Sequence, residues 1–196
     1  MLRYISYSAI DSDSSVRSQA FRAARYLVSS DIISAGLLSL GFDYIIARSL
    51  QRDNKYISER VQTMKFLRAS FQHHVLFCTR PVVHALISLA EHTKDEFRLI
   101  SLDTLREILR LNPSLLSITQ GSTIIIDSLL DPQLNEISSS LSWSLLYLYD
   151  VPSTRHLLSS PFEFGRLFCA YTDFTGVAFS TNAATSLQAI HHDREQ

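Results

Sequence analysis

Two groups of side chains in this 196-residue sequence have types and spacings that could support chemistry. The first is a set of metal-ligand types between positions 73 and 84, namely His73, His74, Cys78 and His84. Imidazole and thiolate are the ligands that zinc prefers, but this spacing matches no closed four-ligand pattern. On a helix His74 and Cys78 would share one face and His73 would point elsewhere. We therefore predict surface or core histidines and no metal site.

The second group consists of arginines that recur in a fixed register. Arg25, Arg68 and Arg106 align when the apolar positions around them are superimposed, with offsets of 43 and 38 residues, and Arg17, Arg60 and Arg98 align with the same offsets. The first column, Arg25, Arg68 and Arg106, is the candidate partner-binding ridge, because stacked guanidinium groups suit an acidic or phosphorylated partner. The structural alternative, which we favour, is that each arginine binds helix-terminal carbonyls or a carboxylate of the next repeat.

No catalytic arrangement emerges from the remaining residues. Serines are abundant but none lies in a Gly-x-Ser-x-Gly elbow, and Cys78 has no Asn or Asp placed to orient a neighbouring histidine. The five glycines are isolated, so no glycine-rich loop could cradle a phosphate. A metal-dependent helical enzyme would need ligands that we do not find. We predict that the protein is not an enzyme and has no catalytic residues, no cofactor and no small-molecule substrate.

The elements that carry these residues are predicted to be helices. In the first of them Phe21, Ala24 and Val28 stand at i, i+3 and i+7, which places them on one helical face. The same spacing recurs downstream in two further triplets: Met64, Leu67 and Phe71, then Leu102, Leu105 and Leu109. The first unit is expected to contain three helices, at Val16–Ser29, Asp31–Leu40 and Phe42–Leu50. A period near 40 residues made only of helices is typical of armadillo or HEAT repeats.

The whole chain is predicted to be an all-α, right-handed armadillo- or HEAT-like solenoid of about four units. After the first unit, the others are expected at Ile57–Ala90, Thr93–Leu130 and Leu134–Tyr171. Residues 1–174 would form this helical-repeat domain, and residues 175–196, which are small and polar, would be a tail or connector.

Helix starts are suggested by residues that cap well. Asn112 and Asp131 each precede a proline suited to the first helical position, and Thr93 and Glu96 have capping-box spacing. The β-branched run Ile124–Ile126 is short, and we interpret it as helical rather than as a strand.

Composition narrows the class of protein further. The formal net charge of −1 and the pI near 6.6 argue against the broad basic face that nucleic acid requires. No apolar run reaches the length of a membrane span, and the N-terminus lacks the apolar core of a signal peptide. Cys78 and Cys169 lie far apart in apolar surroundings, so we expect free thiols in a reducing compartment. We predict a cytoplasmic protein with no nucleic-acid partner and no membrane span.

Several short motifs, in order along the chain, resemble the N-terminal region of the Rictor family, known in fungi as Pianissimo, Ste-sixteen or Avo-three. The motifs that carry the resemblance are Arg22–Leu27, Phe42–Arg48, Glu59–Arg60, Glu107–Pro113, Asp131–Tyr149, Pro152–Arg155 and Tyr171–Phe174. They cover the chain from about Val16 to Phe174. The chain departs from the family at Gly121-Ser122, where paired glycines are usual, and family members continue beyond the position of Gln196.

The resemblance implies a non-catalytic scaffold or regulatory subunit, or a fragment of one, of the target-of-rapamycin kinase complex two. Its partners would be the TOR kinase and the other complex-two subunits, and its location cytoplasmic, with peripheral membrane association as part of a complex. The alternative is a free-standing armadillo-type adaptor that binds extended peptides. Such adaptors carry a ladder of asparagines on the third helix of each repeat, and the third helices here carry Ile45-Ile46, Val82-Val83 and Ile124-Ile125 instead.

Overall fold

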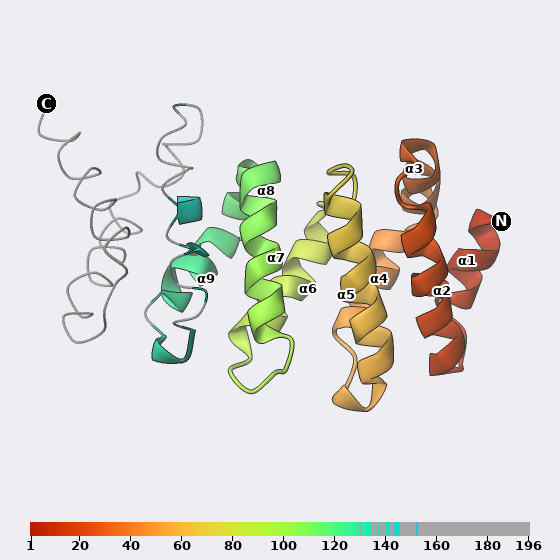
Figure 1. The fold of residues 1–196 in the computed structure, drawn as a ribbon, viewed down its shortest axis with the longest axis horizontal. Coiled ribbons are helices and arrows are strands. Elements are labelled where there is room, and N and C mark those ends of the chain that lie inside the picture. Colours follow the sequence, from red (N-terminus) through yellow and green to blue (C-terminus); the bar gives the residue numbers. More distant parts are fainter. Residues whose placement is uncertain (130, 135–136, 138–139, 142, 146–151, 153–196) are drawn as a thin grey trace, which may run out of the picture. The chain divides into compact units, whose positions relative to one another are not determined.

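The computed structural model describes residues 1–129 and 131–134, together with 137, 140, 141, 143–145 and 152, and every regular element in these residues is a helix (Figure 1). The elements are α1 (Leu2–Ser8), α2 (Ser14–Leu27), α3 (Asp31–Ser39), α4 (Phe42–Leu50), η1 (Asn54–Tyr56), α5 (Ile57–Phe71), α6 (Arg80–Glu91), α7 (Arg98–Leu111), α8 (Pro113–Ile118), α9 (Gly121–Ser128) and η2 (Pro132–Leu134). The predicted all-α, helical-repeat fold class is thereby confirmed. The handedness and the number of units stay predictions.

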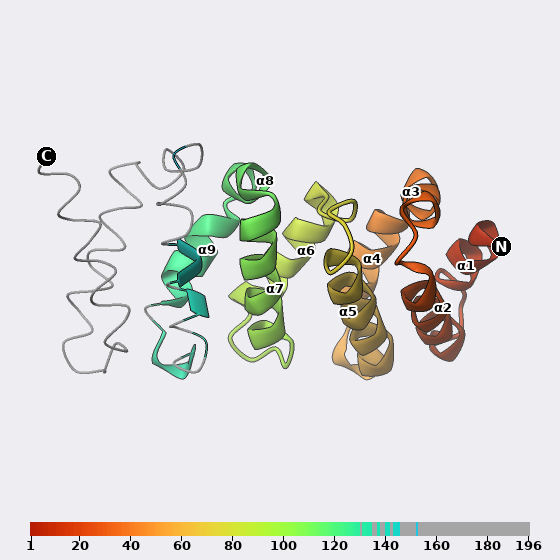
Figure 2. The same ribbon diagram turned by 45° about the horizontal axis from the view of Figure 1, so that its top comes forward.

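The chain divides into two compact units, Met1–His92 and Thr93–Gln196. In the first unit α2 packs along α5 and α4 packs along α6, with α4 and α6 behind the α2/α5 pair (Figures 1 and 2). A hydrogen bond between Ser18 and Ser58 joins α2 and α5 near their starts, and one between His74 and the Val28 carbonyl joins them near their ends, so these two helices run parallel. In the second unit α7, α8 and α9 pack against one another.

A cluster of aromatic rings forms the core of the first unit. Phe21, Phe42, Phe66 and Phe77 come from α2, α4, α5 and the segment before α6, and none of them has exposed surface. Neighbouring ring centroids lie 5.1 to 6.5 Å apart, in tilted or edge-to-face geometry. Such aromatic pairs add to the stabilisation from apolar burial. The nine apolar positions predicted from the repeat are all buried, which confirms the predicted helical face.

The three-helix pattern predicted for each repeat is present in the first repeat, α2–α4, and in the segment α7–α9. Asp13 begins α2 by accepting the Ser15 amide at 2.7 Å, and Gly41, at φ 73°, separates α3 from α4 as predicted. Gly36 lets α3 approach α1 closely, because a Cβ there would meet Leu2 Cδ1 at 2.6 Å. The repeat at Ile57–Ala90 is different, since residues 72–79 between α5 and α6 form no helix. Phe77 enters the core from this non-helical segment instead.

In the second unit, two of the predicted capping residues, Asn112 and Asp131, accept backbone amides, and the third, Thr93, does not begin a helix. Asn112 caps α8 through the Leu115 amide at 3.2 Å, as expected. Asp131 accepts the Gln133 amide at 2.9 Å, and the helix that follows is the 3-10 turn η2. The predicted capping box at Thr93 is wrong: α7 begins at Arg98, because Asp95 accepts the Phe97 amide at 2.8 Å and holds a turn there.

The run Ile124–Ile126 lies inside α9, which confirms the helical interpretation. Most of the predicted fourth unit, and the domain boundary at residue 174, lie outside the described residues. Within those residues no single helix is long and apolar enough to cross a membrane; α3 and α4 reach that length only together, across a 78° bend.

Candidate functional site

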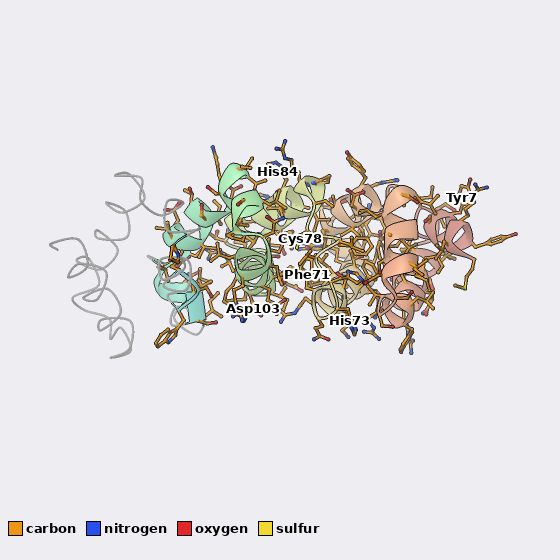
Figure 3. The ribbon with its side chains drawn as sticks, turned by 90° about the horizontal axis from the view of Figure 1, so that it is seen from above. Tyr7, Phe71, His73, Cys78, His84 and Asp103 are labelled. Carbon is orange, nitrogen blue, oxygen red and sulfur yellow. The ribbon has the colours of Figure 1, made fainter. Side chains whose placement is uncertain are left out.

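The histidines and the cysteine of the first unit do not gather into one site. Figure 3 shows His73 and His84 at opposite edges of the ribbon with Cys78 between them. In the part of the chain that the structure describes, no three His, Cys, Asp or Glu side chains lie close enough to hold a metal ion. One of them, His74, makes a structural contact. His74 Nε2 donates to the Val28 carbonyl at 2.8 Å, which ties the end of α2 to the segment after α5.

Cys78 is a protonated thiol at neutral pH. Its side chain is buried, and burial raises the pKa of this thiol to about 12. Because only the thiolate is an effective nucleophile, Cys78 is poorly suited to covalent chemistry.

Two residues of the predicted ridge lie on neighbouring helices. Arg25 and Arg68 occupy equivalent positions near the ends of α2 and α5, and both are half-buried. Arg25 extends over the adjacent Tyr26, with its guanidinium carbon 5.3 Å from the ring centroid and Nη2 3.5 Å from the hydroxyl. Hydrogen bonds from Arg25 and then from Arg22 lower the pKa of Tyr26 below its ordinary value. The site around Tyr26 is therefore positively charged.

The third predicted residue, Arg106, belongs to the second unit and has a carboxylate partner on its own helix. Its Nε and Nη2 lie 2.9 and 2.8 Å from Asp103 Oδ1, one turn earlier on α7. This ion pair offsets the charge of Arg106. The structure thus brings Arg25 and Arg68 to neighbouring helices and gives Arg106 a different electrostatic environment.

Arg17, of the other arginine column, belongs to a buried polar cluster around Glu59. Arg17 and Glu59 are 2% and 1% exposed, and Arg17 Nε donates to Glu59 Oε2 at 2.7 Å. The same guanidinium donates from Nη1 to the carbonyls of Asp11 and Ser12, at 2.7 and 2.8 Å. Nη2 of Arg17 is buried without a partner. A charged pair at this depth is stable only because the surrounding groups supply hydrogen bonds.

The other carboxylate oxygen of Glu59 joins two further elements to this pair. Ser49 at the end of α4 donates to Glu59 Oε1 at 2.9 Å and also contacts the Thr63 hydroxyl at 2.8 Å. Arg52 Nε lies 3.2 Å from the same oxygen, an ion pair without hydrogen-bond geometry. A single buried carboxylate therefore holds together the ends of α2, α4 and α5.

Arg60 and Arg98, the equivalents of Arg17, have similar structural roles. Arg60 is buried, donates from Nε to the Leu50 carbonyl at 3.1 Å at the end of α4, and also hydrogen-bonds Asn54. In the second unit Arg98 Nη2 lies 2.6 Å from Asp131 Oδ2. Burial acts to raise the pKa of Asp131, but the Gln133 amide and the Arg98 guanidinium outweigh it, so the pKa is lowered. This column binds helix ends and carboxylates, which is the structural alternative considered for the first column.

The sequence pattern aligned Arg17, Arg60 and Arg98 but did not predict that Glu59 is the partner of Arg17. The repeat gives no signal for it, since the equivalent positions hold Val16 and Phe97. The constant register of the arginines was the only available indication that this column has a shared role.

The sequence of this chain matches a known protein family. Residues 1–194 match the family described as rapamycin-insensitive companion of mTOR, N-term. The chain is 34% identical to protein pianissimo A of Dictyostelium discoideum over 71% of its length, and 27% identical to rapamycin-insensitive companion of mTOR of Homo sapiens over 81%. It is 28% identical to target of rapamycin complex 2 subunit TSC11 of Saccharomyces cerevisiae, again over 81%. These matches cover 12%, 10% and 11% of the three relatives, so the chain spans about a tenth of their length.

Proposed function

This chain belongs to the family of the N-terminal region of rapamycin-insensitive companion of mTOR, and from that membership we propose that it is a non-catalytic scaffold segment of target of rapamycin complex 2. The observation that carries the proposal is the family match over residues 1–194. One similar protein, TSC11, is named as a subunit of that complex.

The contacts in the first unit support a structural rather than a catalytic role. Three groups that could act as acid, base or nucleophile have structural contacts: Glu59 is paired with Arg17, His74 is hydrogen-bonded to Val28, and Cys78 is buried. A general base or nucleophile must reach a substrate in a cleft, and the buried side chains of Glu59 and Cys78 do not. Rigid packing of this kind is what a scaffold needs to hold partner surfaces in place.

The partners proposed are the TOR kinase and the other subunits of complex 2, with no nucleic acid and no small-molecule substrate. A cytoplasmic location, with peripheral membrane association as part of the complex, is proposed with them. The near-neutral net charge of −1 supports a protein partner over nucleic acid, because phosphate-backbone binding needs an excess of cations.

The test is affinity purification of the tagged chain from cells of its own species, followed by mass spectrometry. The scaffold proposal expects the kinase and complex 2 subunits above the level recovered with the tag alone. A Glu59→Ala variant, which disrupts the packing of the first unit, should recover less of both. Recovery of transport cargo without the kinase would overturn the proposal and favour a free-standing peptide-binding adaptor.

A further inference from the structure

Two adjacent helices of the first unit carry cations with no exposed acid between them. α2 contains no Asp or Glu, and the one acid of α5 is the buried Glu59. Arg22 on α2 and Lys65 on α5 occupy equivalent positions 43 residues apart, one turn before Arg25 and Arg68. Because α2 and α5 run parallel and in contact, these positions lie side by side on the two helices.

Three of these cations have no carboxylate partner. Arg22 and Lys65 are exposed and Arg25 is half-buried, and none of the three lies within ion-pair distance of an acid in the described residues. Arg68 already has an interaction within the protein, so the inference does not depend on it. Arg17 and Arg106 differ from these three, because Glu59 and Asp103 balance their charges. What distinguishes Arg22, Arg25 and Lys65 is that they lie together on two helices that are in contact.

We propose that the basic face, defined as Arg22, Arg25 and Lys65, docks an acidic polypeptide segment of a partner protein. The exposed ring of Tyr26 lies at its edge and adds an apolar surface beside the cations. Guanidinium groups bind carboxylates through paired hydrogen bonds, which suits Asp and Glu side chains. Packed helices lie about 8–10 Å apart, and alternate residues of an extended chain are spaced about 7 Å apart, so adjacent acids of one segment can reach both helices.

The number of cations on the basic face favours a polypeptide ligand over a lipid surface. Recognition of anionic lipids typically uses clusters of about 4–8 Lys or Arg residues, and the basic face offers three. Three cations are sufficient for the few ion pairs that set the specificity and association rate of a protein complex. The inference goes beyond the proposed function and does not depend on it, because its test needs neither the kinase nor any complex 2 subunit.

The experiment measures binding of a fluorescein-labelled peptide of alternating Glu and Ala to the whole chain by fluorescence anisotropy at low salt. The same peptide with Gln in place of Glu is the ligand control. The test variant is Arg22→Gln/Arg25→Gln/Lys65→Gln. The matched control, Arg3→Gln/Arg48→Gln/Arg80→Gln, removes the same charge from exposed arginines on α1, α4 and α6.

The expected result is a loss of affinity of about tenfold or more in the test variant and of less than about twofold in the control, with binding weakened by added salt. Equal losses in both variants, or no binding of the Glu peptide, would overturn the proposal. So would binding to phosphatidylserine vesicles that depends on these three cations while peptide binding does not. Since Arg25 is half-buried, the variant Arg22→Gln/Lys65→Gln, which changes only exposed side chains, decides the matter if the triple variant fails to fold.

Discussion

Arg17 Nε and Glu59 Oε2 lie 2.7 Å apart in the interior of the first unit, where neither side chain is more than 2% exposed. The pair joins the first turn of α2 to the first turn of α5. Because both charges are removed from water, the pair is held in place by the hydrogen bonds around it, from Ser49 on one side and to the Asp11 and Ser12 carbonyls on the other. The register of two adjacent repeats is therefore fixed at one buried ion pair.

Removal of one partner should destabilise the protein strongly. Glu59→Ala leaves the Arg17 guanidinium buried without its carboxylate, which should cost about 3–5 kcal/mol of unfolding free energy. Urea denaturation followed by circular dichroism measures this loss. The control is Lys55→Ala, whose partner Asp53 is 3.8 Å away with both side chains largely exposed, and it should change stability by less than about 0.5 kcal/mol. A Glu59→Ala loss no greater than that of the control would show that water reaches Arg17.

Gly41 and Gln120 should respond to substitution in opposite directions. Both residues precede the last helix of a repeat and both have left-handed backbone angles, with φ of 73° and 63°. A Cβ at position 41 would lie 4.0 Å from Tyr44, so Gly41→Ala creates no collision and its cost is conformational, about 1–2 kcal/mol. Gln120→Gly removes that strain and should stabilise the protein by up to about 1 kcal/mol after the entropic cost of glycine.

Thermal and urea denaturation of both single variants provide the measurement. Ser39→Ala, at an exposed position near the end of α3, serves as the comparison for Gly41→Ala. A destabilised Gln120→Gly variant would mean that the Gln120 side chain contributes more than its backbone strain costs.

Much of the fold could be predicted because apolar burial leaves a periodic signal in the sequence. Phe21, Leu67 and Leu105 lie on faces that recur every 40 residues or so, and all three are fully buried. The non-helical segment at residues 72–79 could not be predicted in this way, since Phe77 fills the core without belonging to any helical period. The start of α7 at Arg98 could not be predicted either. Asp95 and Thr93 are both good capping residues, and only the tertiary structure shows that Asp95 forms the turn before the helix.

The candidate site could be predicted only in part. Side-chain type and register identified two arginine columns. The role of each arginine depends on which carboxylate or carbonyl it contacts, and those contacts are set by the tertiary structure. Arg17 is buried because Glu59 lies opposite it, while Arg25 keeps its charge toward solvent because α2 and α5 offer no acid there. The role of the Arg25 column as a partner-binding surface stays a prediction.

Truncation of a core side chain should reveal how tightly the first unit is packed. Leu67 on α5 has no exposed surface, so Leu67→Ala should cost about 2–5 kcal/mol through lost burial and the cavity left behind. Lys65, two residues earlier and exposed, is the control, and Lys65→Ala should stay within about 0.5 kcal/mol of the parent protein. Urea midpoints of the two variants make the comparison. A loss below about 1 kcal/mol at Leu67 would indicate that the surrounding helices collapse into the space.

The ion pair between Arg98 and Asp131 should make the second unit sensitive to acid. Their atoms lie 2.6 Å apart, and the pKa of Asp131 is lowered in the folded protein. A carboxylate with a lowered folded pKa stabilises the protein above its unfolded pKa of about 3.9 and loses that contribution as the pH falls through the folded value. Asp131→Asn should therefore reduce unfolding free energy by about 1 kcal/mol at pH 7, and the difference from the parent should shrink toward zero as the pH falls through the lowered folded pKa of Asp131. Asp53→Asn, which breaks only the exposed pair with Lys55, should show little difference at either pH. Denaturation curves across this pH range test the expectation, and a difference at Asp131 that persists unchanged in acid would show that its contribution does not come from the charge, because Asn can still accept the Gln133 amide.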